Sequence, residues 1–70
     1  MKPMEEVIAV EGMTCEGCAR SVTRAVSAVP GVESVAVDLA NKRATVRYDP
    51  AVSPIARVRE AIQDAGFDTP

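Results

Sequence analysis

The chain has 70 residues and a net charge of −2, and apolar residues fill 47% of its positions. A chain this short buries only about 60% of its unfolded surface, so we expect one small domain over residues 1–70 without a deep substrate cleft. Nucleic-acid binding needs a concentrated basic surface, which eight basic residues scattered among ten acidic ones do not provide. No apolar run reaches the roughly 20 residues that cross a bilayer, so we expect a soluble, cytoplasmic protein without membrane insertion.

The first part of the sequence predicts a strand followed by a helix. Residues 5–11 are short and β-branched and stop at Gly12, which is typical of a strand that turns sharply into a loop. Beyond the loop, apolar residues recur at helical spacing over residues 18–29, and Pro30 and Gly31 are expected to end that helix. The apolar stripe of this helix consists of Cys18, Val22, Ala25, Val26 and Val29.

The next segment predicts a β-hairpin. Two runs of alternating apolar and polar residues, 32–39 and 43–48, flank a short polar turn at Asn41 and Lys42. Alternation of this kind gives each strand one buried face. The residues expected on the buried face are Val35, Val37, Leu39, Ala44, Val46 and Tyr48.

The last part of the sequence predicts a second helix and a short final strand. Ser53 is expected to be the helix N-cap, Pro54 its first residue and Gly66 its C-terminal cap. The residues that follow Gly66 are enough for a short fourth strand. The predicted fold is therefore α+β, a ferredoxin-like βαββαβ sandwich with a four-stranded antiparallel sheet and two helices on one face. The apolar stripe expected on the second helix is Ile55, Val58, Ile62 and Ala65.

Cys15 and Cys18 are the residues of most chemical interest, because they are the two cysteines of a sequence without histidine. A bare CxxC pair is typical of a metal site, half a zinc ribbon, a redox dithiol or a structural disulfide. Its placement between a loop and a helix favours metal, since a helix N-terminus stabilises the thiolate that binds metal. We expect Cys18 to gain most from this effect and Cys15 to be the more exposed ligand.

The ligand types narrow the choice of metal. Two soft sulfur ligands suit Cu(I), whereas a structural zinc site needs four ligands that this chain does not supply alone. Ag(I) and Hg(II) are equally soft alternatives. The sequence has no histidine to act as a general base, and we expect a metal carrier rather than an enzyme.

The sequence also resembles a known family, the heavy-metal-associated domains. The segment GMTCEGC at residues 12–18 is similar to the GMxCxxC signature of that family. PGV at 30–32, ATV at 44–46 and IQDAGF at 62–67 also fall where the family places them, so the resemblance extends over residues 7–67. The family includes copper chaperones, the N-terminal metal-binding domains of copper-transporting P-type ATPases and a periplasmic mercury-binding protein.

The resemblance implies roles for individual residues. Cys15 and Cys18 match the two metal ligands, and Met13 matches a methionine that points into the core and braces the loop. Thr14 occupies a position where zinc- and cadmium-exporting members often carry an acidic residue, so its presence favours copper. Phe67 matches a position that packs near the metal site, and it is equally suited to filling the core between helix and sheet.

The function implied by the resemblance is that of a Cu(I) metallochaperone that passes one ion to a partner CxxC site by ligand exchange. The expected partner is a copper-transporting P-type ATPase or another CxxC metal-binding domain, and Arg20 and Arg24 match charges that help such domains dock. The apo protein is expected to be a monomer, with copper-bridged dimers at high concentration. The alternatives are an N-terminal domain of a copper-exporting ATPase, a mercury-binding protein and a thiol-disulfide oxidoreductase.

Overall fold

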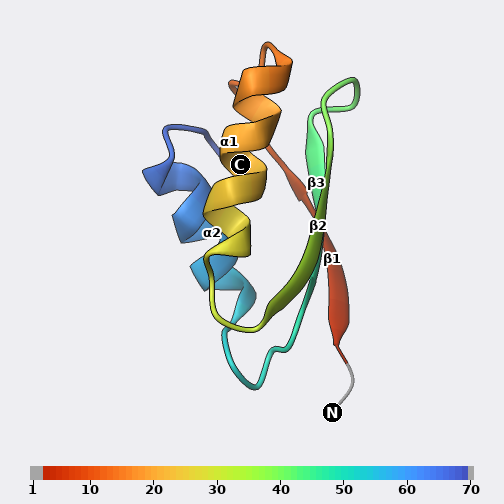
Figure 1. Cartoon of the computed structure of the whole chain (residues 1–70), viewed down its shortest axis with the longest axis vertical. Coiled ribbons are helices and arrows are strands. Elements are labelled where there is room, and N and C mark those ends of the chain that lie inside the picture. The colour runs from red at the N-terminus through yellow and green to blue at the C-terminus, as the bar shows by residue number, and fades with distance from the viewer. Residues whose placement is uncertain (1–2, 70) are drawn as a thin grey trace.

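The computed structural model describes residues 3–69, in which two helices lie on one side of an antiparallel sheet (Figure 1). The elements follow the order β1, α1, β2, β3, α2, as predicted up to the second helix. Neither helix of this part of the chain has the length and apolar character needed to span a bilayer. The elements are β1 Met4–Ala9, α1 Glu16–Ser27, β2 Val32–Asp38, β3 Arg43–Tyr48 and α2 Ile55–Asp64.

The sheet has the strand order β1-β3-β2, and both neighbours of β3 run antiparallel to it. Helix α1 therefore connects two strands that lie on either side of β3, which is the split βαβ arrangement. In the register, Ala44 pairs with Ile8 of β1 and Val37 of β2, and Val46 pairs with Glu6 and Val35. Because β3 is the central strand, its inward side chains are the most completely covered.

The predicted four-stranded sheet is wrong, because the described residues form three strands. The segment after Gly66 makes a single antiparallel bridge, in which Asp68 and Glu11 exchange backbone hydrogen bonds of 2.8 and 3.1 Å. A ladder needs successive pairs, and only Phe67 to Thr69 of the described chain follow Gly66. Pro70, the last residue of the expected strand, lies outside the described residues.

Several predicted boundaries also shift. The first strand was expected over residues 5–11, yet β1 spans Met4–Ala9, and the N–H of Val10 continues its register with a hydrogen bond of 2.9 Å to the carbonyl of Lys42. Helix α1 ends at Ser27, before the proline that was expected to stop it. The chain then makes a turn in which the N–H of Val32 binds the carbonyl of Val29 at 3.2 Å.

The N-cap prediction for the second helix is wrong by one residue. Pro54, with extended backbone angles, is the N-cap of α2 and provides no side-chain hydrogen bond. Ser53 is buried instead, and its N–H binds the carbonyl of Asp49 at 3.1 Å, so tertiary packing overrides its capping preference. At the other end the C-cap is Ala65, one residue before the predicted Gly66, and Gly66 follows it with a φ of +98°, the left-handed conformation that commonly ends a helix. Ala65, expected in the apolar stripe, is exposed.

The core is aliphatic and lies between the helices and the sheet. Val46 and Tyr48 are buried as predicted, while Val35, Val37 and Leu39 of the outer strand are half-buried and pack against the core. The core continues to the end of the molecule where the cysteines lie, since Val10 before Gly12 and Met13 after it both belong to the core. The buried apolar residues are Ile8, Val10, Met13, Val22, Val26, Ala44, Val46, Tyr48, Val58 and Ile62.

Candidate metal site

The loop that carries the cysteines is anchored by buried residues at its start. Val10 is fully buried, Gly12 turns the chain with a φ of +97°, and Met13 returns to the core with 3% of its surface exposed. The prediction that Met13 points into the core is confirmed. Residues 14–17 are exposed and Cys18 is half-buried, so the candidate ligands lie at the surface. The buried side chains of Val10 and Met13 anchor the loop that carries them.

The N-terminus of α1 positions the two cysteines. Cys15 is the N-cap residue with extended backbone, and Cys18 lies in the first turn. The carbonyl of Cys15 accepts hydrogen bonds from the N–H groups of Cys18 at 3.1 Å and Ala19 at 3.2 Å. The first N–H groups of a helix have no carbonyl partner within it, and they leave partial positive charge beside the sulfurs. This end of the helix therefore favours a thiolate.

The two sulfur atoms lie close together, as free thiols. The Sγ atoms of Cys15 and Cys18 are 3.6 Å apart, well beyond a disulfide bond length. Two metal–sulfur bonds of about 2.3 Å each, the length found for zinc, would span this separation at a single ion. Cys15 is exposed, whereas Cys18 is half-buried and packs against the core, which confirms that Cys15 is the more exposed of the two.

Hydrogen bonds lower the pKa of the Cys18 thiol below its ordinary value. The largest cause is a bond from the backbone of Thr14, followed by one from the side chain of Cys15, and desolvation opposes both. The hydroxyl Oγ1 of Thr14 lies 4.0 Å from Cys18 Sγ and contributes in the same direction. Cys18 thus holds a thiolate more readily than an ordinary cysteine does.

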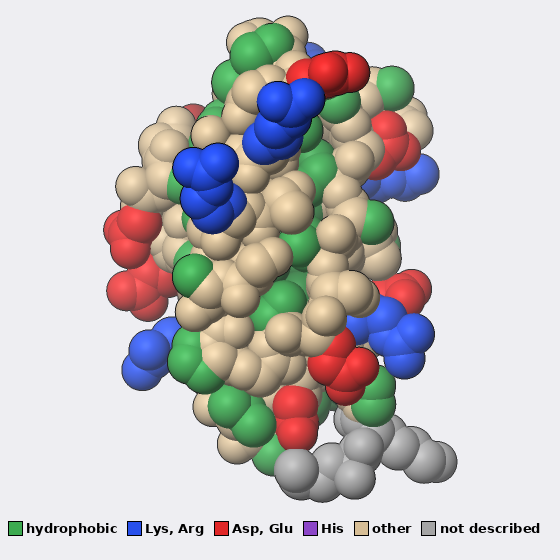
Figure 2. Space-filling view, viewed as in Figure 1, with side chains coloured by type: hydrophobic (Ala, Val, Ile, Leu, Met, Phe, Trp, Pro, Cys, Tyr) green, Lys and Arg blue, Asp and Glu red, His purple; other side chains and the backbone are tan. Residues whose placement is uncertain are grey.

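Basic side chains stand along the exposed face of the same helix. Arg20 and Arg24, here called the basic patch, are exposed residues of α1, and Figure 2 shows Lys and Arg side chains over this helix. Arg20 also lies 4.0 Å from Glu16 in a strongly exposed ion pair. A pair of this kind contributes little to stability and leaves the positive charge accessible.

The C-terminal segment contacts the start of the cysteine loop. Phe67 is half-buried against the core, and a Cβ placed on Gly12 would lie 3.6 Å from its Cδ1 atom. The backbone bridge between Glu11 and Asp68 holds this contact in place. The two roles expected for Phe67, packing in the core and packing near the loop, are therefore combined.

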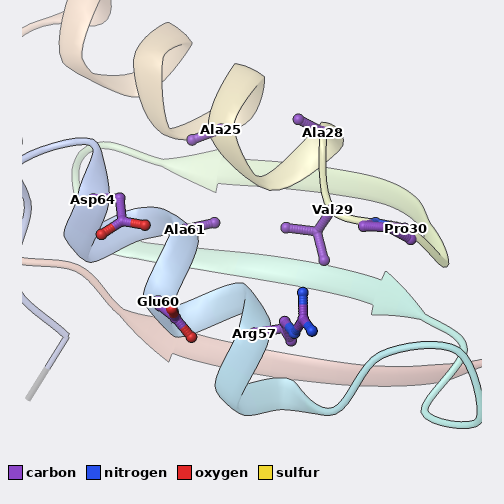
Figure 3. Close-up of a pocket in the computed structure, with 8 residues that line it drawn as sticks. All are labelled: Ala25, Ala28, Val29, Pro30, Arg57, Glu60, Ala61 and Asp64. Atoms are coloured by element: carbon purple, nitrogen blue, oxygen red, sulfur yellow. The ribbon is translucent and has the colours of Figure 1, made fainter.

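The surface also has a groove that the sequence patterns did not predict. A groove of about 280 Å³ lies between the C-terminal part of α1 and α2 (Figure 3). Small residues on facing helices, Ala25 and Ala61, are the signal that would have indicated it. Neither cysteine lines the groove. Among the described residues, no group of three or more His, Cys, Asp or Glu side chains is placed to hold a metal ion, so the cysteine pair is the candidate site.

Comparison with known proteins identifies the family of the chain. The profile of the family described as "Heavy-metal-associated domain" matches residues 7–68. Copper-transporting ATPase 1 of Mus musculus is 45% identical over 64 residues, which make up 91% of this chain and 4% of that protein. The chain thus spans a small fraction of the length of this ATPase.

Two solved structures are matched over nearly their whole length. The structure of "CopZ metallochaperone" has a TM-score of 0.93 and 34% identity, with 96% of this chain and 100% of that chain covered. Oxidized MerP from Ralstonia metallidurans CH34 has a TM-score of 0.93 and 32% identity, with 97% and 94% covered. With its sequence, fold and paired cysteines in agreement, the chain belongs to the heavy-metal-associated domain family.

Proposed function

We propose that this protein carries one Cu(I) ion on Cys15 and Cys18 and delivers it to a partner CxxC site. The observation that carries the proposal is the pair of free thiols, 3.6 Å apart, at the exposed N-terminus of α1. The described residues supply no cluster of further ligands around them. A site with two soft ligands and open sides suits an ion that accepts low coordination and must later leave.

The names of the relatives favour copper, and one residue disfavours harder divalent ions. The curated ATPases that the chain resembles are named as copper transporters. Thr14 offers a neutral hydroxyl where a carboxylate would favour harder divalent ions. Ag(I) and Hg(II) share the preference of Cu(I) for sulfur and are expected to bind the same pair.

Transfer would proceed by exchange of sulfur ligands. A thiolate of the acceptor donates an electron pair to the bound ion and forms a third metal–sulfur bond. One original bond then breaks, and its electron pair stays on the departing cysteine sulfur. No electron is transferred and the ion is never free, so the protein acts as a carrier and not as an enzyme.

The partner in this proposal is a copper-transporting P-type ATPase or another CxxC domain in the cytoplasm, where thiols stay reduced. The basic patch of Arg20 and Arg24 would steer an acidic partner surface toward the site, and this steering weakens as salt is added. The apo protein would be monomeric. At high concentration, one ion bound by four sulfurs from two chains would produce copper-bridged dimers.

A second candidate function is a metal-binding domain at the N-terminus of a copper-exporting ATPase. It is favoured by the 45% identity to part of Copper-transporting ATPase 1 and by the solved copper-binding domain of the P-type ATPase HMA7, which is 38% identical. A tethered domain would use the same cysteines. A reading frame that continues past residue 70 into apolar spans would establish this alternative.

Anaerobic competition with a Cu(I) chelator of known affinity tests the proposal. The wild type should retain about one Cu(I) per chain, and Cys15→Ser and Cys18→Ser should each lose this retention because one sulfur cannot hold the ion against the chelator. Retention by the double variant would contradict the assignment of the ligands. Rapid disulfide reduction without metal would instead favour an oxidoreductase, and a strong preference for Hg(II) would favour mercury binding.

A further inference from the structure

Gly17 is a helical residue whose missing side chain would touch one of the ligand sulfurs. It lies in the first turn of α1 and is exposed. A Cβ placed on Gly17 would lie 3.7 Å from Cys15 Sγ, and in the described structure it would meet no other atom within 4 Å outside its chain neighbours and its own helix. A separation of 3.7 Å is ordinary van der Waals contact, so an alanine fits here without a clash.

The glycine is therefore not explained by local packing or backbone geometry. Its φ is not in the left-handed region, unlike that of Gly12, Gly31 and Gly66. A glycine within a helix is less favourable than an alanine by up to about 1 kcal/mol, because it has more conformational freedom to lose. Glycine at this position therefore makes the helix less stable than alanine would, although the contact that an alanine Cβ would add is with Cys15 Sγ.

The two ligand sulfurs have different surroundings. Cys18 is half-buried against the core, and the hydroxyl of Thr14 lies 4.0 Å from its sulfur. Cys15 is exposed, and the position beside it is occupied by Gly17, which has only a hydrogen in place of a side chain. The space that a side chain at residue 17 would fill beside Cys15 Sγ is therefore left open to an incoming ligand.

We propose that Gly17 determines the rate of metal transfer by keeping this side of Cys15 open to the incoming sulfur. The inference rests on the proposed function, since it concerns the exchange of ligands at the same site. The acceptor thiolate approaches over Gly17 and bonds to the ion, and a bond to an original cysteine breaks with its electron pair retained by sulfur. A side chain at residue 17 blocks the approach without removing a ligand.

Alkylation of the apo protein by iodoacetamide tests the access without any metal. Gly17→Ala and Gly17→Leu add side chains of increasing size, and helical side chains point back toward the N-terminus, here toward Cys15. Ser27→Leu, an exposed position at the far end of α1, is the matched control. Rates at Cys15 are measured by peptide mapping on the high-pH plateau of the reaction, so that differences between variants report access to the sulfur.

The Cys15 alkylation rate should fall about threefold in Gly17→Ala and further in Gly17→Leu, since thiolate reactions depend on access to the attacking sulfur. Ser27→Leu should react like the wild type. The melting temperature of Gly17→Ala should rise by a few degrees, because alanine is the better helix former. If alkylation of Cys15 slows while the melting temperature rises, the slower rate reflects reduced access to the sulfur and not a change in unfolding. An unchanged Cys15 rate in Gly17→Leu would overturn the proposal.

Exchange of Cu(I) from the unlabelled loaded chain to a ¹⁵N-labelled apo copy, followed by mass spectrometry, tests the effect on transfer. Donors with Gly17→Ala and Gly17→Leu should transfer progressively more slowly, while their retention of Cu(I) against a chelator stays at the wild-type level. Normal exchange despite slowed alkylation would overturn the role in transfer. Failure of the wild type to bind Cu(I) would reject the proposed function itself, and the alkylation result would still report on access to Cys15.

Discussion

The two connections that lead from a strand into a helix reach the helix in the same way but are stabilised differently. The loop from β1 to α1 and the loop from β3 to α2 both start a helix at a residue with extended backbone and no side-chain cap. The second loop is closed by its own hydrogen bonds, in which the carbonyl and carboxylate of Asp49 accept N–H groups from Ala51, Val52 and Ser53. The first loop has its anchor, Met13, in the core and leaves two thiols exposed or half-buried at the helix start.

This difference explains how one small fold keeps a stable framework and an open site. Polar groups at a helix start need partners, and in the second loop the chain supplies them for the residues before α2. In the first loop the stabilising contact is apolar and lies below the surface, at Met13. The polar side of the loop, with Cys15, is then available for a ligand from outside. The comparison predicts that the two loops respond differently to damage.

The largest effect is expected from Met13→Ala. Removing most of a buried methionine side chain leaves a cavity and should lower the free energy of unfolding by about 3 kcal/mol, measured by urea denaturation. Because Met13 anchors the loop, Cu(I) retention against a chelator should fall as well. Met13→Leu, which keeps the volume, should stay within about 1.5 kcal/mol of the wild type. Unchanged metal retention in Met13→Ala would show that the loop needs no apolar anchor.

A smaller effect is expected in the other loop from Asp49→Ala. The carboxylate accepts the N–H of Ala51 at 2.9 Å, and its loss should cost about 1 kcal/mol in the free energy of unfolding. Cu(I) retention should not change, because Asp49 belongs to the loop without cysteines. Asp49→Asn keeps an acceptor oxygen and is the control. A loss of metal retention in Asp49→Ala would contradict the independence of the two loops.

The lowered pKa of Cys18 predicts a pH effect confined to the first loop. Its thiol should be alkylated with a lower pH midpoint in the folded protein than in urea, because hydrogen bonds in the fold favour the thiolate. Since the folded pKa is the lower one, the thiolate stabilises the fold fully above the unfolded pKa, and this contribution is lost as the pH falls through the folded pKa. Equal midpoints in the folded and unfolded protein would rule out the stabilising hydrogen bonds.

The smallest effect on stability is expected at the ion pair of Glu16 and Arg20. Both side chains are strongly exposed and 4.0 Å apart, so Arg20→Gln should change the free energy of unfolding by less than about 0.5 kcal/mol. The association rate with an acidic partner domain should fall at low salt and approach that of the wild type at high salt. Arg57→Gln, on α2, removes the same charge outside the basic patch and is the control.

The sequence was most informative where one local pattern controlled the outcome. Alternation in residues 43–48 predicted that Ala44, Val46 and Tyr48 are buried, and β3 buries them because it is the central strand. It was least informative where packing competes with local preference. Ser53 has the chemistry of an N-cap, yet it is buried in the loop before Pro54. The final strand was overestimated because a strand forms only where it pairs with a neighbour, and among the described residues after Gly66 only Asp68 makes such a pair.

The sequence by itself determined the candidate ligands and the way they are presented. Residue type and spacing indicate a soft-metal pair at the start of a helix, and the helical stripe places Cys18 closer to the core than Cys15. The tertiary structure decided what surrounds that pair. The contact of Phe67 with Gly12 joins residues that are far apart in the sequence. The 3.6 Å between the sulfurs and the open position at Gly17 beside Cys15 depend on the local backbone path and on side-chain placement. A linear sequence pattern encodes neither.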